Sequence, residues 1–250
     1  MALPALVLVH GGGVAADCWE PTVAAIHRMD PELRVLAVDL PGRRGKSGDL
    51  FAACIDEWAD SVVADIKHAG LDDDLVIVGH SFAGVTVPAA VTKLGSARVR
   101  EMILATAFVP PDGAALVDTM PGALGWYARR TSERNLQKRV AGGLPTTWAK
   151  FAYCNGMTRD QRTFTLTRSC PESPAIALEN VDRRGIPDDV PRTWILTRRD
   201  RAISPKTQRE SIAALGGVQT LIEIDTCHML MVSEPERLAE ILTERCRLYA

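Results

Sequence analysis

The chain has 250 residues, of which 46% are hydrophobic and 24% are charged, with 29 Lys and Arg against 31 Asp and Glu. These proportions are ordinary for a globular protein, so they exclude a disordered, fibrous or low-complexity chain. The formal net charge of −2 provides no general attraction to nucleic acid or to acidic membranes.

The cysteines and the N-terminus indicate the compartment. The six cysteines are scattered without a CxxC pair, and a chain of this length needs no disulfides. No apolar run approaches the roughly 20 residues of a membrane span. The N-terminus also lacks the basic region that begins a signal peptide. We therefore expect a cytoplasmic protein without a membrane partner, either a monomer or a homodimer.

Short runs rich in Val, Ile and Leu alternate with longer amphipathic segments along the chain. Most runs lack strict polar and apolar alternation, which is typical of parallel strands buried on both faces. The predicted elements, in chain order, are a strand at 3–9, a helix at 17–28, a strand at 34–38, a helix at 52–69, a strand at 75–78, a helix at 84–94, strands at 99–105 and 193–197, a helix at 206–215, a strand at 218–224 and a helix at 235–249. This order predicts an α/β fold with a doubly wound, mostly parallel sheet.

The stretch 109–187 interrupts this alternation, because it contains no strand-like run and is punctuated by prolines. It is too long for a structureless loop in a compact domain. We predict a helical cap insertion over 109–187, above the carboxyl edge of the sheet, where open α/β sheets bind ligands. The core domain then consists of 1–108 and 188–250.

The sequence Gly79-His80-Ser81-Phe82-Ala83 connects a predicted strand directly to a predicted helix. A strand-to-helix turn this tight needs small residues two positions before and after its middle residue, and Gly79 and Ala83 meet that need. Ser81 then projects above the sheet, beside a helix N-terminus that favours negative charge. A serine can instead simply cap a helix, but the strand–turn–helix context favours a nucleophile.

A glycine-rich turn, His10-Gly11-Gly12-Gly13, follows the first predicted strand. Glycines let backbone N–H groups face a cavity without a side chain in the way. Two such donors can stabilise the oxyanion of ester hydrolysis. We predict that the N–H groups of Gly12 and Phe82 form this oxyanion hole, although a glycine triplet alone is also typical of a plain turn.

A serine hydroxyl needs a base, and the base needs an orienting acid. His228 lies between the last predicted strand and the last helix, where a loop can carry its imidazole over Ser81. Asp200 directly follows the next-to-last strand. We predict His228 as the base and Asp200 as the acid, with Asp112, after the strand ending near residue 105, as the rival acid.

At these residues the chain resembles the α/β-hydrolase superfamily over nearly its whole length. The stretches that carry the resemblance are His10-Gly11-Gly12-Gly13, Asp39-Leu40-Pro41-Gly42-Arg43, Gly79-His80-Ser81-Phe82-Ala83-Gly84, Arg199-Asp200 and Cys227-His228-Met229. The resemblance implies the α/β-hydrolase fold and a catalytic triad in the chain order Ser81, Asp200, His228.

Within that superfamily the chain is most similar to the branch of small methylesterases and hydroxynitrile lyases. Met229 and Gly11 stand where the lyases of this branch carry Lys and Thr. The resemblance therefore implies a serine hydrolase that cleaves a carboxylic ester through an acyl-enzyme. The alternatives are a lyase, C–C hydrolase or thioesterase with the same triad, or a small-molecule-binding protein of this fold.

The expected partner is a small acyl or ester substrate, and we predict that Gly11, His80, Trp126 and Met229 contact it. The aromatic residues of the insertion can line an apolar pocket or simply hold the insertion together. We find no HExxH motif, no Walker motif and no GxGxxG motif. We therefore expect no metal and no cofactor.

Overall fold

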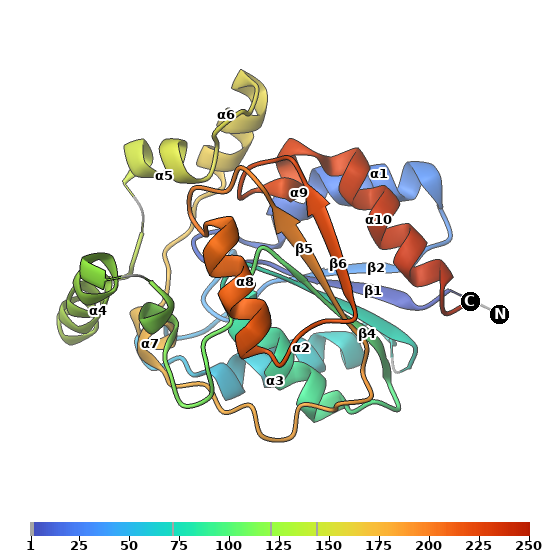
Figure 1. The fold of residues 1–250 in the computed structure, drawn as a ribbon, viewed down its shortest axis with the longest axis horizontal. Coiled ribbons are helices and arrows are strands. Elements are labelled where there is room, and N and C mark those ends of the chain that lie inside the picture. Colours follow the sequence, from blue (N-terminus) through green and yellow to red (C-terminus); the bar gives the residue numbers. More distant parts are fainter. Residues whose placement is uncertain (1–2, 72, 121, 144) are drawn as a thin grey trace.

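The protein is described by a computed structural model that covers residues 3–71, 73–120, 122–143 and 145–250. Within these residues, six strands form one sheet in the order β2-β1-β3-β4-β5-β6, and each neighbouring pair is parallel (Figure 1). The strands are β1 (Ala5–Val9), β2 (Val35–Val38), β3 (Leu75–His80), β4 (Val99–Ala105), β5 (Arg192–Thr197) and β6 (Thr220–Ile224). The predicted parallel sheet is confirmed.

Helices cover both faces of this sheet, as a doubly wound fold requires (Figure 1). The first strand shows why: Ala5, Val7 and Val9 point into one apolar cluster, while Leu6 and Leu8 point into the other. Successive side chains of a strand face opposite sides, so a strand buried on both faces must be apolar throughout. The covering helices are α1 (Glu20–Met29), α9 (Leu230–Ser233) and α10 (Pro235–Arg247) on one face, and α2 (Ile55–His68), α3 (Ala83–Leu94) and α8 (Pro205–Ala214) on the other.

The structure moves several predicted boundaries by a few residues. The helix predicted from residue 17 begins as a 3-10 turn, η1 (Ala16–Trp19), and becomes α-helical at Glu20. The last predicted helix is preceded by the short helix α9, and α10 starts at Pro235. Proline suits the first turn of a helix because the N–H it lacks would have no partner there.

The chain between β4 and β5 adds no strand to the sheet within the described residues. It forms η2 (Leu116–Thr119), α4 (Gly122–Gln137), α5 (Thr146–Ala152), α6 (Arg159–Thr167) and α7 (Pro174–Leu178). Helices α5 and α6 lie toward the side to which the arrows of β5 and β6 point (Figure 1), and Asn155, between these helices, donates to the Arg199 carbonyl after β5 at 2.8 Å. This agrees with a helical insertion at the carboxyl edge of the sheet, and we keep 109–187 as its proposed extent.

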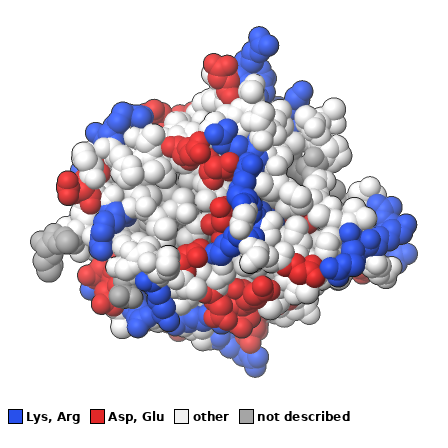
Figure 2. Space-filling model, turned by 180° about the vertical axis from the view of Figure 1, so that it is seen from behind, with Lys and Arg blue, Asp and Glu red and all other residues white. Residues whose placement is uncertain are grey.

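The surface carries both signs of charge, with acidic and basic side chains interspersed over the face in Figure 2. Basic side chains gather at the edge where α4 lies, and this helix contains Arg129, Arg130 and Arg134. Among the described helices, none combines the length and apolar character needed to cross a membrane.

Gly84 provides a test of how closely α3 packs on the loop after β4. A Cβ atom at this position would overlap the carbonyl oxygen of Phe108 and lie 3.0 Å from the Cβ of Ala107. We expect Gly84→Ala to lower the free energy of unfolding by about 1–3 kcal/mol, as overpacking does. In an exposed helix the same change would stabilise by up to about 1 kcal/mol.

Urea unfolding of the two proteins measures this difference. Gly143→Ala is the matched control, because a Cβ atom at Gly143 would meet open space. Its effect should stay within about 0.5 kcal/mol. Equal stability of Gly84→Ala and the unaltered protein would contradict the close approach.

Candidate active site

Ser81 occupies the turn between β3 and α3 with a φ of +54°, in the left-handed region that residues other than glycine rarely adopt. Three backbone hydrogen bonds hold it there: its N–H donates to Ala105 at 3.3 Å, and its carbonyl accepts from Gly84 and Phe108 at 3.0 Å. A side chain at Gly79 would come within 2.8 Å of Val87. The close approach of α3 is therefore the reason that position 79 needs a residue without a side chain.

The structure brings Ser81, His228 and Asp200 into one chain of hydrogen bonds. The Nε2 atom of His228 lies 3.0 Å from the Ser81 Oγ, and its Nδ1 atom lies 2.8 Å from the Asp200 Oδ2. All three side chains are at most 5% exposed. Because a carboxylate only accepts, Nδ1 carries the proton and Nε2 is left to accept the serine O–H.

The Asp200 carboxylate is surrounded by donors. Burial alone would raise its pKa, but His228 and the hydrogen-bond donors outweigh burial and hold the pKa of Asp200 below its usual value. The donors besides His228 are the backbone N–H groups of Ala202 and Ile203 and the hydroxyls of Thr106 and Thr197. Asp200 therefore stays ionised and faces His228 in a fixed orientation.

The rival acid, Asp112, lies outside this arrangement. Its side chain is exposed, and its Oδ1 accepts from the backbone N–H of Arg183 at 2.9 Å. Asp200, not Asp112, is therefore the carboxylate that contacts His228.

The His10 side chain joins the glycine-rich turn to the core through two hydrogen bonds. The Nδ1 of His10 donates to the Gly11 carbonyl at 2.8 Å, and its Nε2 accepts from the Leu40 N–H at 3.1 Å. Since the carbonyl can only accept and the N–H can only donate, this ring is neutral with the proton on Nδ1. In a trans peptide the N–H points opposite to the carbonyl, so the Gly12 N–H is directed away from His10.

The two residues predicted to supply the oxyanion donors lie close together. A Cβ atom on Gly12 would lie 3.0 Å from the Phe82 ring, which places the glycine turn against the start of α3. Within the described part of the chain, neither the Gly12 N–H nor the Phe82 N–H has a hydrogen-bond acceptor. The oxyanion hole at Gly12 and Phe82 remains a prediction with which this lack of an acceptor is compatible.

Gly11 and His80, two of the predicted substrate contacts, lie directly beside Ser81. A Cβ atom on Gly11 would be 2.7 Å from the Ser81 Cβ and 2.8 Å from the His80 Nδ1, so no side chain fits there. His80 is 1% exposed and its Nε2 donates to the backbone carbonyl of His228 at 3.0 Å. This bond positions His228.

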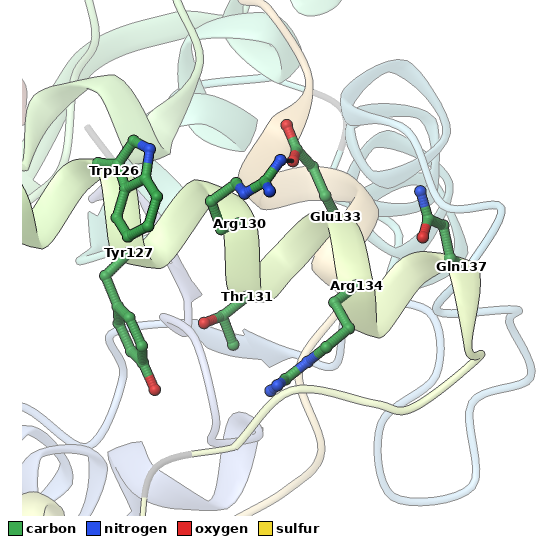
Figure 3. A pocket seen from close by; sticks show the side chains of 7 residues that line it. All are labelled: Trp126, Tyr127, Arg130, Thr131, Glu133, Arg134 and Gln137. Carbon is green, nitrogen blue, oxygen red and sulfur yellow. Dashed lines mark ion pairs between the residues drawn. The ribbon is translucent and has the colours of Figure 1, made fainter.

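The structure does not bring the other two predicted contacts to the site. Met229 is 1% exposed and packs in the apolar cluster beneath α9. Trp126 is 66% exposed on α4, where it lines a shallow surface pocket formed by that helix alone (Figure 3). In the same pocket the Nη1 atom of Arg130 lies 4.0 Å from the Oε2 atom of Glu133. The structure therefore does not support the predicted contacts of Met229 and Trp126 with the substrate.

Several residues of the site escaped the sequence analysis. Thr106 and Thr197 contact Asp200, and a polar residue at the end of a buried strand was a signal that could have identified them. Tyr153, after α5, stacks on the His228 ring with 4.9 Å between centroids and an interplanar angle of 27°. No pattern in the sequence distinguishes Tyr153 from the other aromatic residues of the insertion. In the described residues no group of three potential metal ligands occurs.

Two buried histidines, His10 and His80, predict acid sensitivity. Burial is the main cause that lowers the pKa of His10 and of His80 from 6.5 to about 3. The folded chain therefore keeps both rings neutral, whereas the unfolded chain protonates them as the pH falls through about 6.5. We expect the free energy of unfolding to fall by up to about 2.7 kcal/mol per pH unit between about pH 6 and pH 5, which corresponds to two protons.

Chemical denaturation at a series of pH values measures this slope. Replacing one buried ring, as in His80→Gln, should halve the slope, whereas His27→Gln, at an exposed position, serves as the control. A flat profile between pH 6 and pH 5 would contradict the neutral, buried state of these rings.

Comparisons with known proteins agree with this architecture. A model of the alpha/beta hydrolase family matches residues 6–241. Two curated relatives come from Arabidopsis thaliana. Methylesterase 18 is 21% identical over 253 residues, covering 95% of each chain. Putative methylesterase 11, chloroplastic, is 23% identical over 267 residues and covers 97% of this chain, which spans 64% of that relative.

Among solved structures, an extracellular alpha/beta-hydrolase from a Paenibacillus species superposes with a TM-score of 0.85 at 21% identity, covering 96% of this chain and 98% of the other. At this identity the likeness concerns the fold. The residues that the family model matches include Ser81, Asp200 and His228 and nearly all the strands and helices of the fold. This chain belongs to the alpha/beta hydrolase family.

Proposed function

We propose that this protein is a cofactor-independent hydrolase of small carboxylic esters, with Ser81 as its nucleophile. The observation that carries the proposal is the buried series of hydrogen bonds from Ser81 through His228 to Asp200. A serine hydroxyl is a weak nucleophile unless a base removes its proton, and this series supplies the base and its orienting acid.

In the first half-reaction, the Ser81 Oγ attacks the ester carbonyl while His228 Nε2 takes the serine proton. The imidazolium that forms is stabilised by Asp200, whose carboxylate is already fixed by four other donors. The carbonyl oxygen becomes an oxyanion and accepts from the N–H groups of Gly12 and Phe82. His228 then gives its proton to the departing alcohol, which leaves the acyl group on Ser81.

In the second half-reaction, water replaces the alcohol. His228 takes a proton from this water as the oxygen attacks the acyl carbonyl, and the same two N–H groups donate to the second oxyanion. Return of the proton to Ser81 releases the carboxylic acid. This cycle requires only the groups of this chain and one water molecule.

Two features favour ester hydrolysis over cyanohydrin cleavage. Gly11 stands where the lyases of this branch carry a threonine, and its surroundings leave no space for a side chain. Met229 stands where they carry a lysine, and it is buried among apolar residues. The curated relatives whose names denote methylesterases support the same choice.

The decisive experiment is Ser81→Ala. We expect this variant to lose turnover of short-chain methyl and aryl esters and to lose labelling by a fluorophosphonate, because both need the Oγ atom. Its unfolding midpoint should remain near that of the unaltered protein, since only one oxygen atom is removed. Ester turnover and labelling at the level of the unaltered protein would refute the proposed nucleophile.

The identity of the acid is tested by a pair of variants. Asp200→Asn removes the charge that orients His228, and we expect kcat to fall by roughly 10⁴. Asp112→Asn, the matched control at the rival carboxylate, should leave kcat unchanged within about twofold. Steady-state kinetics on one ester measure both. The proposed acid would be wrong if the larger loss followed Asp112→Asn.

A further inference from the structure

Two residues of the insertion form hydrogen bonds with the glycine-rich turn, which contains the predicted oxyanion donor Gly12. The N–H of Gly13 donates to the Glu172 Oε2 at 2.8 Å, and the Gly13 carbonyl accepts from the Cys170 N–H at 2.8 Å. Glu172 itself is paired through its backbone with Gly142, another residue of the insertion. The turn is therefore held by His10 from the core and by residues 170–172 from the insertion.

Together these contacts fix three successive peptide groups. His10 binds the carbonyl of the Gly11–Gly12 peptide, Glu172 binds the N–H of the Gly12–Gly13 peptide, and Cys170 binds the carbonyl of the next. Glycine has more backbone freedom than any other residue, and Gly13 has a φ of +71°. His10 fixes the peptide that carries the Gly12 N–H, and Glu172 and Cys170 fix the two peptides that follow it, where the turn has no side chain of its own.

The Glu172 carboxylate is matched by a buried arginine. The Nη2 atom of Arg43 lies 2.6 Å from the Glu172 Oε1, which also accepts from the Ser173 N–H at 2.6 Å. Arg43 is 1% exposed, its Nε donates to the Val14 carbonyl at 3.3 Å, and its guanidinium lies over the Trp58 ring. The two oxygens of Glu172 thus accept from different partners: Oε1 accepts from Arg43 and Oε2 accepts from the Gly13 N–H.

The charge of Arg43 also matters for the reaction. The Glu172 Oε2 would be 2.8 Å from a Cβ atom on Gly12, so a carboxylate lies beside the predicted oxyanion donor. An unpaired negative charge there would oppose the negative charge that develops on the ester oxygen. Arg43 neutralises Glu172 and leaves its hydrogen bond to the turn intact.

We propose that Glu172 and Arg43 are positioning residues for the oxyanion hole: Glu172 fixes the glycine turn that presents the Gly12 N–H, and Arg43 fixes and neutralises Glu172. This inference rests on the proposed ester hydrolysis. It makes the oxyanion hole a joint product of the core and the insertion, because neither His10 nor Glu172 alone orients all three peptide groups.

The test is Glu172→Gln. An amide has a donor on one side, so it faces either Gly13 N–H or Arg43 with the wrong polarity. Displacing a catalytic group by about 1 Å can cost roughly 10²-fold, so we expect kcat to fall by about 10- to 100-fold with KM changed by less than about threefold. The matched control is Asp118→Asn, because Asp118 also accepts from an arginine and a backbone N–H in the insertion but does not touch the turn.

Two competitive inhibitors separate positioning from a merely structural role. An aryl trifluoromethyl ketone becomes an oxyanion when it adds to Ser81, and its inhibition constant should rise by about the same factor by which kcat/KM falls. The corresponding alcohol forms no oxyanion, and its inhibition constant should change by less than about threefold. Equal weakening of both inhibitors, or an unchanged kcat in Glu172→Gln, would overturn the inference.

A second variant guards against loss of folding. Arg43→Met combined with Glu172→Leu removes both charges and leaves no unpaired buried ion, so this protein should fold and still show the reduced kcat. A fully active double variant would refute the assignment. Should Ser81→Ala keep its ester turnover, the proposed function fails as a whole. An inactive Ser81→Ala beside a fully active Glu172→Gln rejects only the positioning role.

Discussion

The hydrogen bond between His228 and Asp200 sets the direction of everything else in the site. With Nδ1 committed to the carboxylate, Nε2 can only accept, and Ser81 is the donor within reach. The sheet makes this meeting possible. Four strands that are neighbours in the sheet, β3, β4, β5 and β6, end in turn at Ser81, Thr106, Asp200 and His228 or a few residues before them. Groups far apart in sequence thus meet along one edge of a parallel sheet.

The buried pair of Arg43 and Glu172 is better explained by orientation than by stability. Replacing a buried ion pair by apolar residues of similar volume is often neutral or stabilising, because both ions lose their hydration on burial. Here the pair is placed where a flexible turn, made of three glycines, needs an external partner. The glycines let the turn pass close to Ser81 and Phe82. The same lack of side chains leaves its conformation to be determined by neighbours.

The sequence was most informative where a local rule acts. The run from β3 through Ser81 to α3 needs small residues beside the serine, so this strand-to-helix turn could be predicted from five residues. Asp200 and His228 could be predicted because each follows a strand of a parallel sheet by three or four residues. Glu172 and Tyr153 could not, because their roles depend on how the insertion folds back over the sheet. Trp126 shows the same weakness: an aromatic residue in the insertion was as compatible with the outer surface of α4 as with a pocket.

The imidazole of His228 is confined on several sides. Tyr153 stacks on it, the His80 ring packs against it at 4.8 Å, and both nitrogens are engaged at its edge. A half-turn of the ring about its Cβ–Cγ bond would break both hydrogen bonds and press against these neighbours. In the proposed cycle, Nε2 is therefore the nitrogen that transfers every proton, and the hydrolytic water must reach the same atom that the departing alcohol has left. In that proposed cycle, the packing around His228 makes departure of the alcohol precede entry of the water.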